Sequence, residues 1–212
     1  MSALYFGALV TGTGAVTGPT INGGAFGLSV HGVQGTTFTI TNVIATATTG
    51  SALSVNGFAT AEVVVSGGSF TGGNYGIRVL ASVASSSRLT LDGGAFSGTL
   101  RAAYFRLAVA GAVSIRGGTY SSVPGSTVSC VAFEQPTTGT VVISGAAVSA
   151  DQFGVWFQGI NGGDATLTDV TSTTTVVGGT SLLADDVIGG AQLVVTLVGQ
   201  THRSYIAPPS SP

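Results

Sequence analysis

The sequence predicts an all-β fold, a parallel β-helix in which about eight coils stack into one rod. Three observations lead to this prediction. A short motif recurs at intervals of roughly 25 residues along most of the 212-residue chain, as in proteins built from stacked units. Apolar and polar residues alternate within each copy with the period of two that β-strands require. Glycine pairs follow several of the copies, at the point where a sharp bend would lead into the next strand.

The first predicted strand of each coil is clearest in Val63–Phe70, which reads VVVSGGSF. The central apolar residue of each copy is the anchor for alignment, and successive anchors recur at similar intervals, apart from a shorter first one. The residue two positions earlier is mostly apolar, and the residue after the anchor is always polar, so alternate residues are expected to face the core. The anchors are Ile21, Ile40, Val65, Leu91, Ile115, Ile143, Leu167 and Val195.

A corner is predicted after the anchor strand, because glycine tolerates the positive φ that a sharp bend often requires. The glycine pairs are Gly23–Gly24, Gly67–Gly68, Gly93–Gly94 and Gly117–Gly118, and Asp169 stands at the same offset in a later coil. Beyond the corner, a large apolar residue at a fixed offset from the anchor is expected to stack on its equivalents inside the bend. This predicted column consists of Phe26, Phe70, Phe96 and Tyr120, followed by Val148.

A second strand is predicted in each coil, with one outward residue between two inward ones. The segments read GLSV, ALSV, GIRV, YFRL, CVAF, GVWF and SLLA. Their outward residues form a predicted surface column of Ser29, Ser54, Arg78, Arg106, Ala132, Trp156 and Leu183.

Part of this column predicts a self-association face. Arg78 and Arg106 would lie on adjacent coils, which is unfavourable unless an anion or a partner's carboxylate is near. Trp156 and Leu183 would be outward and apolar, and an exposed apolar strip marks an interface more often than a ligand pocket. We therefore expect these four residues to pack against identical copies about the rod axis. The alternative is that they are unrelated exposed residues.

The two ends of the chain do not repeat. Residues 17–198 are predicted to form the β-helix, and residues 1–16 to form an N-terminal cap or anchor. Residues 199–212 are predicted to form an extended C-terminal arm, because Pro208–Pro209 cannot join a sheet ladder. No Lys or Arg precedes the apolar segment Ala3–Val10, so no signal peptide is expected. No segment approaches the ~20 apolar residues of a membrane span.

Charged residues make up only 7% of the chain, and the net charge is −2. There is no basic cluster, which argues against nucleic acid or an anionic membrane surface as a partner. His31 and His202 lack further ligands at metal-binding spacing, so neither a metal nor a cofactor is expected. The single Cys130 is predicted to be a small packing residue in an apolar run.

Catalytic residues are not predicted either. Glycoside hydrolysis, a common activity of β-helix proteins, generally uses two carboxylates roughly 5–10 Å apart. No two carboxylates of this chain fall clearly on one column of adjacent coils. Asp92 is expected to lie beside Arg116 of the next coil as an exposed ion pair. The chain is therefore predicted to be non-enzymatic.

The coil pattern, apolar-x-apolar-polar-Gly-Gly-x-aromatic, resembles the right-handed parallel β-helices of bacteriophage tailspikes, tail fibres and virion-surface decoration proteins. The resemblance covers about Val16–Val198 and is architectural, and pectate-lyase-like enzymes and autotransporter adhesins share it. It implies a non-enzymatic virion structural protein, a short fibre or decoration on head or tail, made in the host cytoplasm. Its partners would be its own copies, in a homotrimer, and a capsid or tail protein. Two alternatives stay open: a receptor-binding module for a host surface glycan and, less favoured, a polysaccharide depolymerase.

Overall fold

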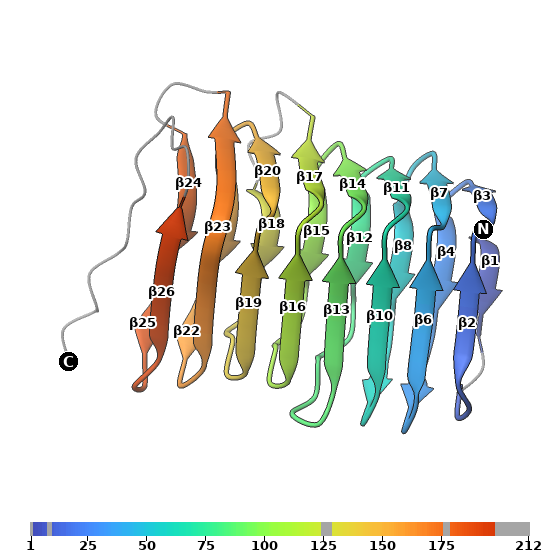
Figure 1. Cartoon of the computed structure of the whole chain (residues 1–212), viewed down its shortest axis with the longest axis horizontal. Coiled ribbons are helices and arrows are strands. Elements are labelled where there is room, and N and C mark those ends of the chain that lie inside the picture. Colours follow the sequence, from blue (N-terminus) through green and yellow to red (C-terminus); the bar gives the residue numbers. More distant parts are fainter. Residues whose placement is uncertain (1, 8–9, 124–128, 176–178, 198–212) are drawn as a thin grey trace.

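The computed structural model describes residues 2–7, 10–123, 129–175 and 179–197. Across these ranges the regular structure is β-strand without any helix. The strands wind into a parallel β-solenoid of about seven turns, which confirms the predicted fold (Figure 1). In Figure 1 the front strands run upward, the back strands run downward, and successive coils advance from right to left, so the solenoid is right-handed.

Each coil contributes to three faces. The front sheet contains β2 (Gly14–Thr17), β6 (Thr37–Thr41), β10 (Glu62–Ser66), β13 (Arg88–Asp92), β16 (Ala112–Arg116), β19 (Thr140–Ser144), the first part of β23 (Asp164–Thr174) and β26 (Gln192–Leu197). The upper sheet contains β3 (Thr20–Gly23), β7 (Ile44–Ala47), β11 (Ser69–Gly72), β14 (Ala95–Gly98), β17 (Thr119–Ser122), β20 (Ala147–Ala150) and the end of β23. The back sheet contains β1 (Ser2–Phe6), β4 (Phe26–Val30), β8 (Ser51–Val55), β12 (Tyr75–Val79), β15 (Arg101–Phe105), β18 (Ser129–Phe133), β21 (Phe153–Phe157) and β24 (Thr180–Ala184).

Two short strand pairs lie where the chain passes from the back sheet to the front sheet. They are β5 (Val33–Gln34) with β9 (Phe58–Ala59), and β22 (Ile160–Asn161) with β25 (Val187–Ile188). All named strand pairs in the described ranges are parallel, as expected when each coil lies directly on the previous one.

The register of the front sheet confirms the anchors from Ile40 onward and corrects the first one. Ile21 lies in β3 of the upper sheet, where it pairs with Ala45. The true anchor is Val16, which pairs with Ile40 and restores an interval like those of the later coils. Phe26 is displaced for the same reason: it lies in β4 of the back sheet and not in the aromatic column.

The solenoid begins earlier than predicted. Ser2–Phe6 forms β1, which pairs in register with β4, and Gly14–Thr17 forms β2 of the front sheet. Part of the segment predicted to be a cap or anchor, residues 1–16, is therefore itself a coil of the solenoid. The predicted C-terminal arm, residues 199–212, lies outside the described residues.

At the corner after each front strand, the first corner residue adopts the left-handed backbone conformation, with φ between 51° and 75°. This holds for every front strand from β2 to β19 and for the equivalent corner within β23. Glycine fills most of these positions, and Asn42 and Asp169 fill two others with φ of 51° and 54°. Asn and Asp are the side-chain-bearing residues that tolerate this conformation best. The prediction that Asp169 substitutes for a corner glycine is confirmed.

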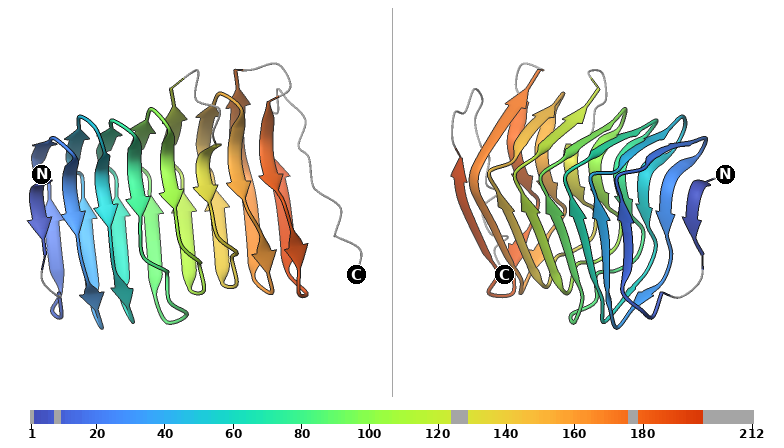
Figure 2. Two further views of the ribbon diagram at one scale, coloured as in Figure 1. Left: turned by 180° about the vertical axis from the view of Figure 1, so that it is seen from behind. Right: turned by 45° about the vertical axis from the view of Figure 1, so that its right-hand side comes forward.

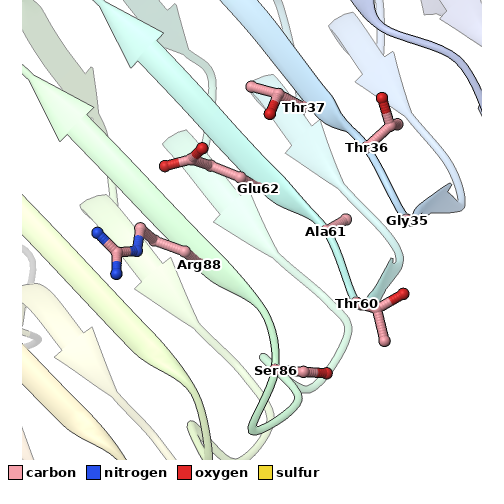
Figure 3. A pocket seen from close by; sticks show the side chains of 8 residues that line it. All are labelled: Gly35, Thr36, Thr37, Thr60, Ala61, Glu62, Ser86 and Arg88. Carbon is pink, nitrogen blue, oxygen red and sulfur yellow. The ribbon is translucent and has the colours of Figure 1, made fainter.

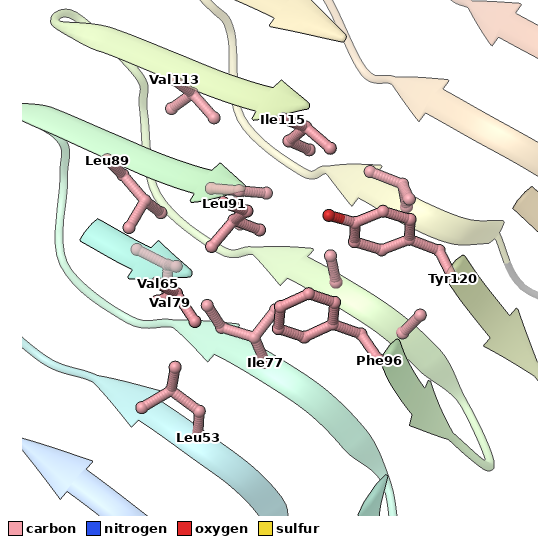
Figure 4. Close-up of a cluster of buried hydrophobic side chains, with 14 of the residues drawn as sticks. Leu53, Val65, Ile77, Val79, Leu89, Leu91, Phe96, Val113, Ile115 and Tyr120 are labelled. Carbon is pink, nitrogen blue, oxygen red and sulfur yellow. The ribbon is translucent and has the colours of Figure 1, made fainter. Parts of the chain in front are cut away.

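The core consists of apolar columns that run along the solenoid (Figure 4). In the upper sheet the rings of Phe70, Phe96 and Tyr120 stack with centroids 5.0 and 5.1 Å apart and planes within 7° of parallel, and Val148 follows in register, as predicted. A second ring stack lines the inner face of the back sheet. Cys130 is a fully buried free thiol, and burial raises its pKa to about 12, which fits the predicted packing role.

Replacing Tyr120 by Phe is expected to stabilise the protein by about 1 kcal/mol. The Tyr120 hydroxyl is buried and has no hydrogen-bond partner in the described part of the chain, and Phe96 occupies the equivalent position one coil earlier. Burial also raises the pKa of Tyr120 above its ordinary value of 10.0. The unfolded chain therefore loses this proton first, and stability falls as the pH rises above about 10.

Urea unfolding at neutral pH and above pH 10 tests both parts of this prediction. The variant should have the higher midpoint at neutral pH and should lose less stability in alkali. A lower midpoint at neutral pH would show that the hydroxyl has a stabilising partner.

Candidate functional site

The back sheet faces the viewer in Figure 2 (left). In β12, β21 and β24 the first and fourth residues are the partly exposed ones. The second, third and fifth residues are buried, as Gly76, Ile77 and Val79 are in β12. The parallel register aligns the fourth residues into one column, which we call the outer column. It consists of Tyr5, Ser29, Ser54, Arg78, Tyr104, Ala132, Trp156 and Leu183.

Three of the four residues predicted for self-association lie in the outer column. Arg78, Trp156 and Leu183 are there, and each is partly exposed. The predicted place of Arg106 is wrong: the register partner of Arg78 is Tyr104, and Arg106 lies beyond the end of β15, exposed. Arg106 therefore does not stack on Arg78. Self-association through this face stays a prediction.

Five side chains in the middle of this surface make contact across neighbouring strands, and we call them the aromatic–arginine cluster. The Tyr75 and Tyr104 rings stack with centroids 5.1 Å apart. The Arg78 guanidinium carbon lies 5.2 Å from the Tyr75 ring centroid, and that of Arg101 lies 4.4 Å from the Tyr104 centroid. The members are Tyr75, Arg78, Arg101, Tyr104 and Trp156.

Trp156 joins the cluster through Arg101, whose guanidinium carbon lies 6.0 Å from the indole. Ala132, between Tyr104 and Trp156 in the outer column, is fully buried although it faces outward. Its register partners, Tyr104 and Trp156, both carry large aromatic side chains. In the cluster, Tyr75, Trp156 and the two arginines are partly exposed, whereas Tyr104 is buried. Buried serines such as Ser54 border the cluster on the N-terminal side.

Two carboxylates border the cluster, and each accepts a hydrogen bond from a ring. The Tyr104 hydroxyl donates to Glu134 Oε2, and Trp156 Nε1 donates to Asp185 Oδ2 at 3.0 Å. Glu134 Oε1 also lies 4.0 Å from Arg101 Nη1. Burial, followed by the hydrogen bond to Glu134, raises the pKa of Tyr104 to about 12, so Tyr104 stays a neutral donor at physiological pH.

The two arginines of the cluster are incompletely satisfied. Arg78 Nε and Arg101 Nε are buried and have no hydrogen-bond partner within the described residues. Arg101 has Glu134 nearby, whereas none of the described carboxylates lies within 4.0 Å of Arg78. A guanidinium that is partly removed from water and has no counterion is costly for the free protein.

Sequence reasoning missed Tyr75, Arg101 and Tyr104. The signal that would have found Tyr104 is the coil interval, because Tyr104 follows Arg78 at the same interval at which the anchor Leu91 follows Val65. Tyr75 and Arg101 carry no such signal, because strict alternation does not place the first and fourth residues of a strand on the same face.

An open depression of about 450 Å³ lies at the lower edge of the front sheet (Figure 3). Thr60, with φ of 52°, stands at its rim, and Glu62 and Arg88 are register partners on β10 and β13. None of the described residues that line it is aromatic, so it offers polar groups but no apolar platform. Its lining residues are Gly35, Thr36, Thr37, Thr60, Ala61, Glu62, Ser86 and Arg88.

Asp92 and Arg116 are register neighbours, as predicted, but they do not form the expected ion pair. The Arg116 Nε donates instead to Ser114 Oγ at 3.1 Å. No group of three or more His, Cys, Asp or Glu side chains able to hold a metal ion is found in the described ranges. None of the described segments is a helix long and apolar enough to cross a membrane.

Comparison with family models, with curated proteins and with solved structures finds no match to this chain.

Proposed function

We propose that this protein is a non-enzymatic rod of a bacteriophage virion surface and that the aromatic–arginine cluster is its recognition site for a surface glycan. The observation that carries the recognition part is the clustering of partly exposed Tyr75, Arg78, Arg101 and Trp156 on one face of the solenoid. The virion part depends on the resemblance of the coil pattern to phage β-helices.

The chemistry of a sugar matches this surface. A pyranose ring offers C–H faces that pack on aromatic rings and a rim of hydroxyl groups that donate and accept hydrogen bonds. Trp156 and Tyr75 supply the rings, and Arg101 and Glu134 supply a donor and an acceptor close beside them. The rings are held by their own contacts, so little side-chain freedom is lost on binding.

The same residue types also favour a second copy of the chain as the occupant, since Trp, Tyr and Arg dominate protein–protein hot spots. Acidic residues, however, are depleted at protein–protein interfaces, whereas Arg is enriched there. Here the carboxylates of Glu134 and Asp185 border the cluster. This charge favours a polar ligand over the apolar trimer face expected from the sequence.

The non-enzymatic part of the proposal is based on the two carboxylates. Glu134 and Asp185 follow β18 and β24, two coils apart, which corresponds to about 9.6 Å along the solenoid. That separation is at the upper limit for an inverting glycosidase. Both carboxylates accept hydrogen bonds from ring donors of the cluster, which suits a structural role better than proton transfer.

Trp156→Ala is expected to weaken glycan binding roughly thirtyfold, the loss of a central aromatic contact of about 2 kcal/mol. The measurement is binding of the full chain to a printed array of neutral and acidic bacterial oligosaccharides, followed by affinity measurement on the strongest hit. Tyr5→Ala is the control, because Tyr5 is an exposed aromatic residue of the same outer column at the far end of the rod.

Three other outcomes would contradict the proposal. Equal losses in both variants would show non-specific adhesion. No bound glycan, together with a trimer that Trp156→Glu converts to monomer in light scattering, would identify the face as a subunit interface. Cleavage of a bound glycan that Glu134→Gln abolishes would make the protein a depolymerase.

A further inference from the structure

We infer that the ligand of the aromatic–arginine cluster is an acidic saccharide, and that Arg78 binds its carboxylate or sulfate group. This inference rests on the proposed glycan-binding function and names the class of glycan.

The first argument is the local charge. Arg78, Arg101 and Arg106 lie on or beside the middle of the back sheet, together with the carboxylates of Glu134 and Asp185. Three of the five arginines in the described ranges therefore lie on or beside this surface, so positive side chains are concentrated here. An acidic ligand is therefore attracted to this surface in preference to the rest of the solenoid.

The second argument is the position of the uncompensated charge. Glu134 lies 4.0 Å from Arg101 and balances it in part. Arg78 has no described carboxylate within that distance, and its coil neighbours in the outer column are Ser54 and Tyr104. Of the two arginines in the aromatic–arginine cluster, Arg78 is therefore the one without a carboxylate partner.

The third argument is the way in which Arg78 is held. Its guanidinium contacts the Tyr75 ring, which is itself stacked on Tyr104. Its Nε–H group is buried with no acceptor in the described parts of the chain. The guanidinium is thus held in place, partly exposed and without a counterion, and its remaining N–H groups suit the forked hydrogen bonding of a carboxylate or sulfate.

Geometry also favours a saccharide over a small free anion. Arg78 lies on β12 and Trp156 lies on β21. The back-sheet order β12-β15-β18-β21 places these two residues three coils apart. At ~4.8 Å per coil this is about 14 Å, the length of a short oligosaccharide and far more than one anion can span. A chain of sugars can pack on Trp156 while an acidic group on another unit reaches Arg78.

The test uses three polysaccharides as probes: polygalacturonate with carboxylates, heparin with sulfates, and dextran as the neutral control. The wild-type full chain is expected to bind one of the acidic probes and to lose affinity as the salt concentration rises, whereas dextran binds weakly. Arg78→Gln should weaken acidic-probe binding roughly tenfold to a hundredfold, the worth of a hydrogen bond to a charged group. Arg116→Gln is the matched control, because Arg116 is an exposed arginine of the front sheet.

A second variant keeps the test valid if Arg78→Gln folds poorly. Arg78→Lys retains the charge and should keep the salt dependence while it loses part of the affinity. Equal losses in Arg78→Gln and Arg116→Gln would overturn the inference, because binding would then depend on overall charge alone.

Failure of this inference differs from failure of the proposed function. If array binding is confined to neutral glycans and is lost in Trp156→Ala, the site is a glycan site and the assignment to acidic saccharides is wrong. If no glycan binds at all, both are wrong.

Discussion

Leu91→Asp is expected to prevent the protein from folding at neutral pH. Leu91 is fully buried in β13, where its register partners are Val65 and Ile115 of the neighbouring coils. The substitution removes a core side chain, which alone costs about 2.7–5.0 kcal/mol, and it places an unpaired carboxylate in the apolar column. Together these changes are comparable to the whole stability of a typical domain, about 5–15 kcal/mol.

Thr90→Asp provides the matched control, one residue away. Thr90 faces outward from the same strand, with Val64 and Ser114 as its register partners. A carboxylate there is solvated, and we expect the free energy of unfolding to change by less than about 1 kcal/mol. Circular dichroism and urea unfolding of both variants provide the comparison. Similar stability in the two variants would mean that Leu91 does not face the core.

This pair of residues also shows why the architecture was predictable. Leu91 and Thr90 have the same environments as Val65 and Val64 one coil earlier, because each coil lies directly on the last. A single strand gives an ambiguous alternation, but the same alternation repeated in successive coils fixes which side faces the core. The corner residue Asp169 was predictable for a similar reason, since its offset matched that of a glycine in other coils.

The errors arose where two alignments of the sequence were equally good. PTINGGAF matches the motif around Ile21, whereas the true first coil around Val16 has Gly18–Pro19 at its corner in place of a glycine pair. The short interval from Ile21 to Ile40 indicated that Ile21 was not the anchor, since the interval from Val16 to Ile40 resembles those of the later coils.

The segment RAAYFRL likewise offered two choices of inward residues. Phe105 with Leu107 makes a more apolar pair than Ala103 with Phe105, but the structure adopts the second, and Leu107 is 41% exposed. Backbone pairing with β12 fixes this register, and the side-chain pattern alone does not contain that information.

The candidate site was only partly predictable for a different physical reason. Alternation assigns the first and third residues of a strand to one face, yet in the back sheet the first residue lies with the fourth. Tyr75 therefore reaches Tyr104, and Arg101 reaches Trp156, through contacts that strict period two excludes. Trp156 and Arg78 were predicted correctly because each is the fourth residue of its strand. The third and fifth residues are buried, so simple alternation places the fourth residue on the outer face.

Phe133→Ala is the second substitution expected to have a large effect, a loss of about 3–5 kcal/mol in the free energy of unfolding. Phe133 is 1% exposed and lies in the middle of the ring stack on the inner face of the back sheet. Its centroid is 4.4 Å from that of Phe105 and 4.6 Å from that of Phe157, with planes within 8° of parallel. Removing the middle ring leaves a cavity and breaks both stacking contacts at once.

Val142→Ala is the control for this experiment, because Val142 faces outward from the front sheet in β19. It should change stability by no more than about 0.5 kcal/mol. Urea unfolding can be followed by the fluorescence of the single tryptophan, Trp156, which stands beside Phe157 on β21. A cost for Phe133→Ala no larger than that of the control would show that the rings are loosely packed.

The double variant Phe133→Ala, Phe157→Ala tests whether the stack acts as one unit. Its cost should be smaller than the sum of the two single costs, because either substitution already removes the contact between the two rings. Additive costs would mean that each ring is stabilised by burial alone. The side chains under the outer surface of the back sheet would then act independently, and Trp156 would keep its position when the Phe133 ring on the neighbouring strand is removed.

Coupled costs instead predict that Phe133→Ala also weakens glycan binding at Trp156, since β18 and β21 share the ring stack and pair in register.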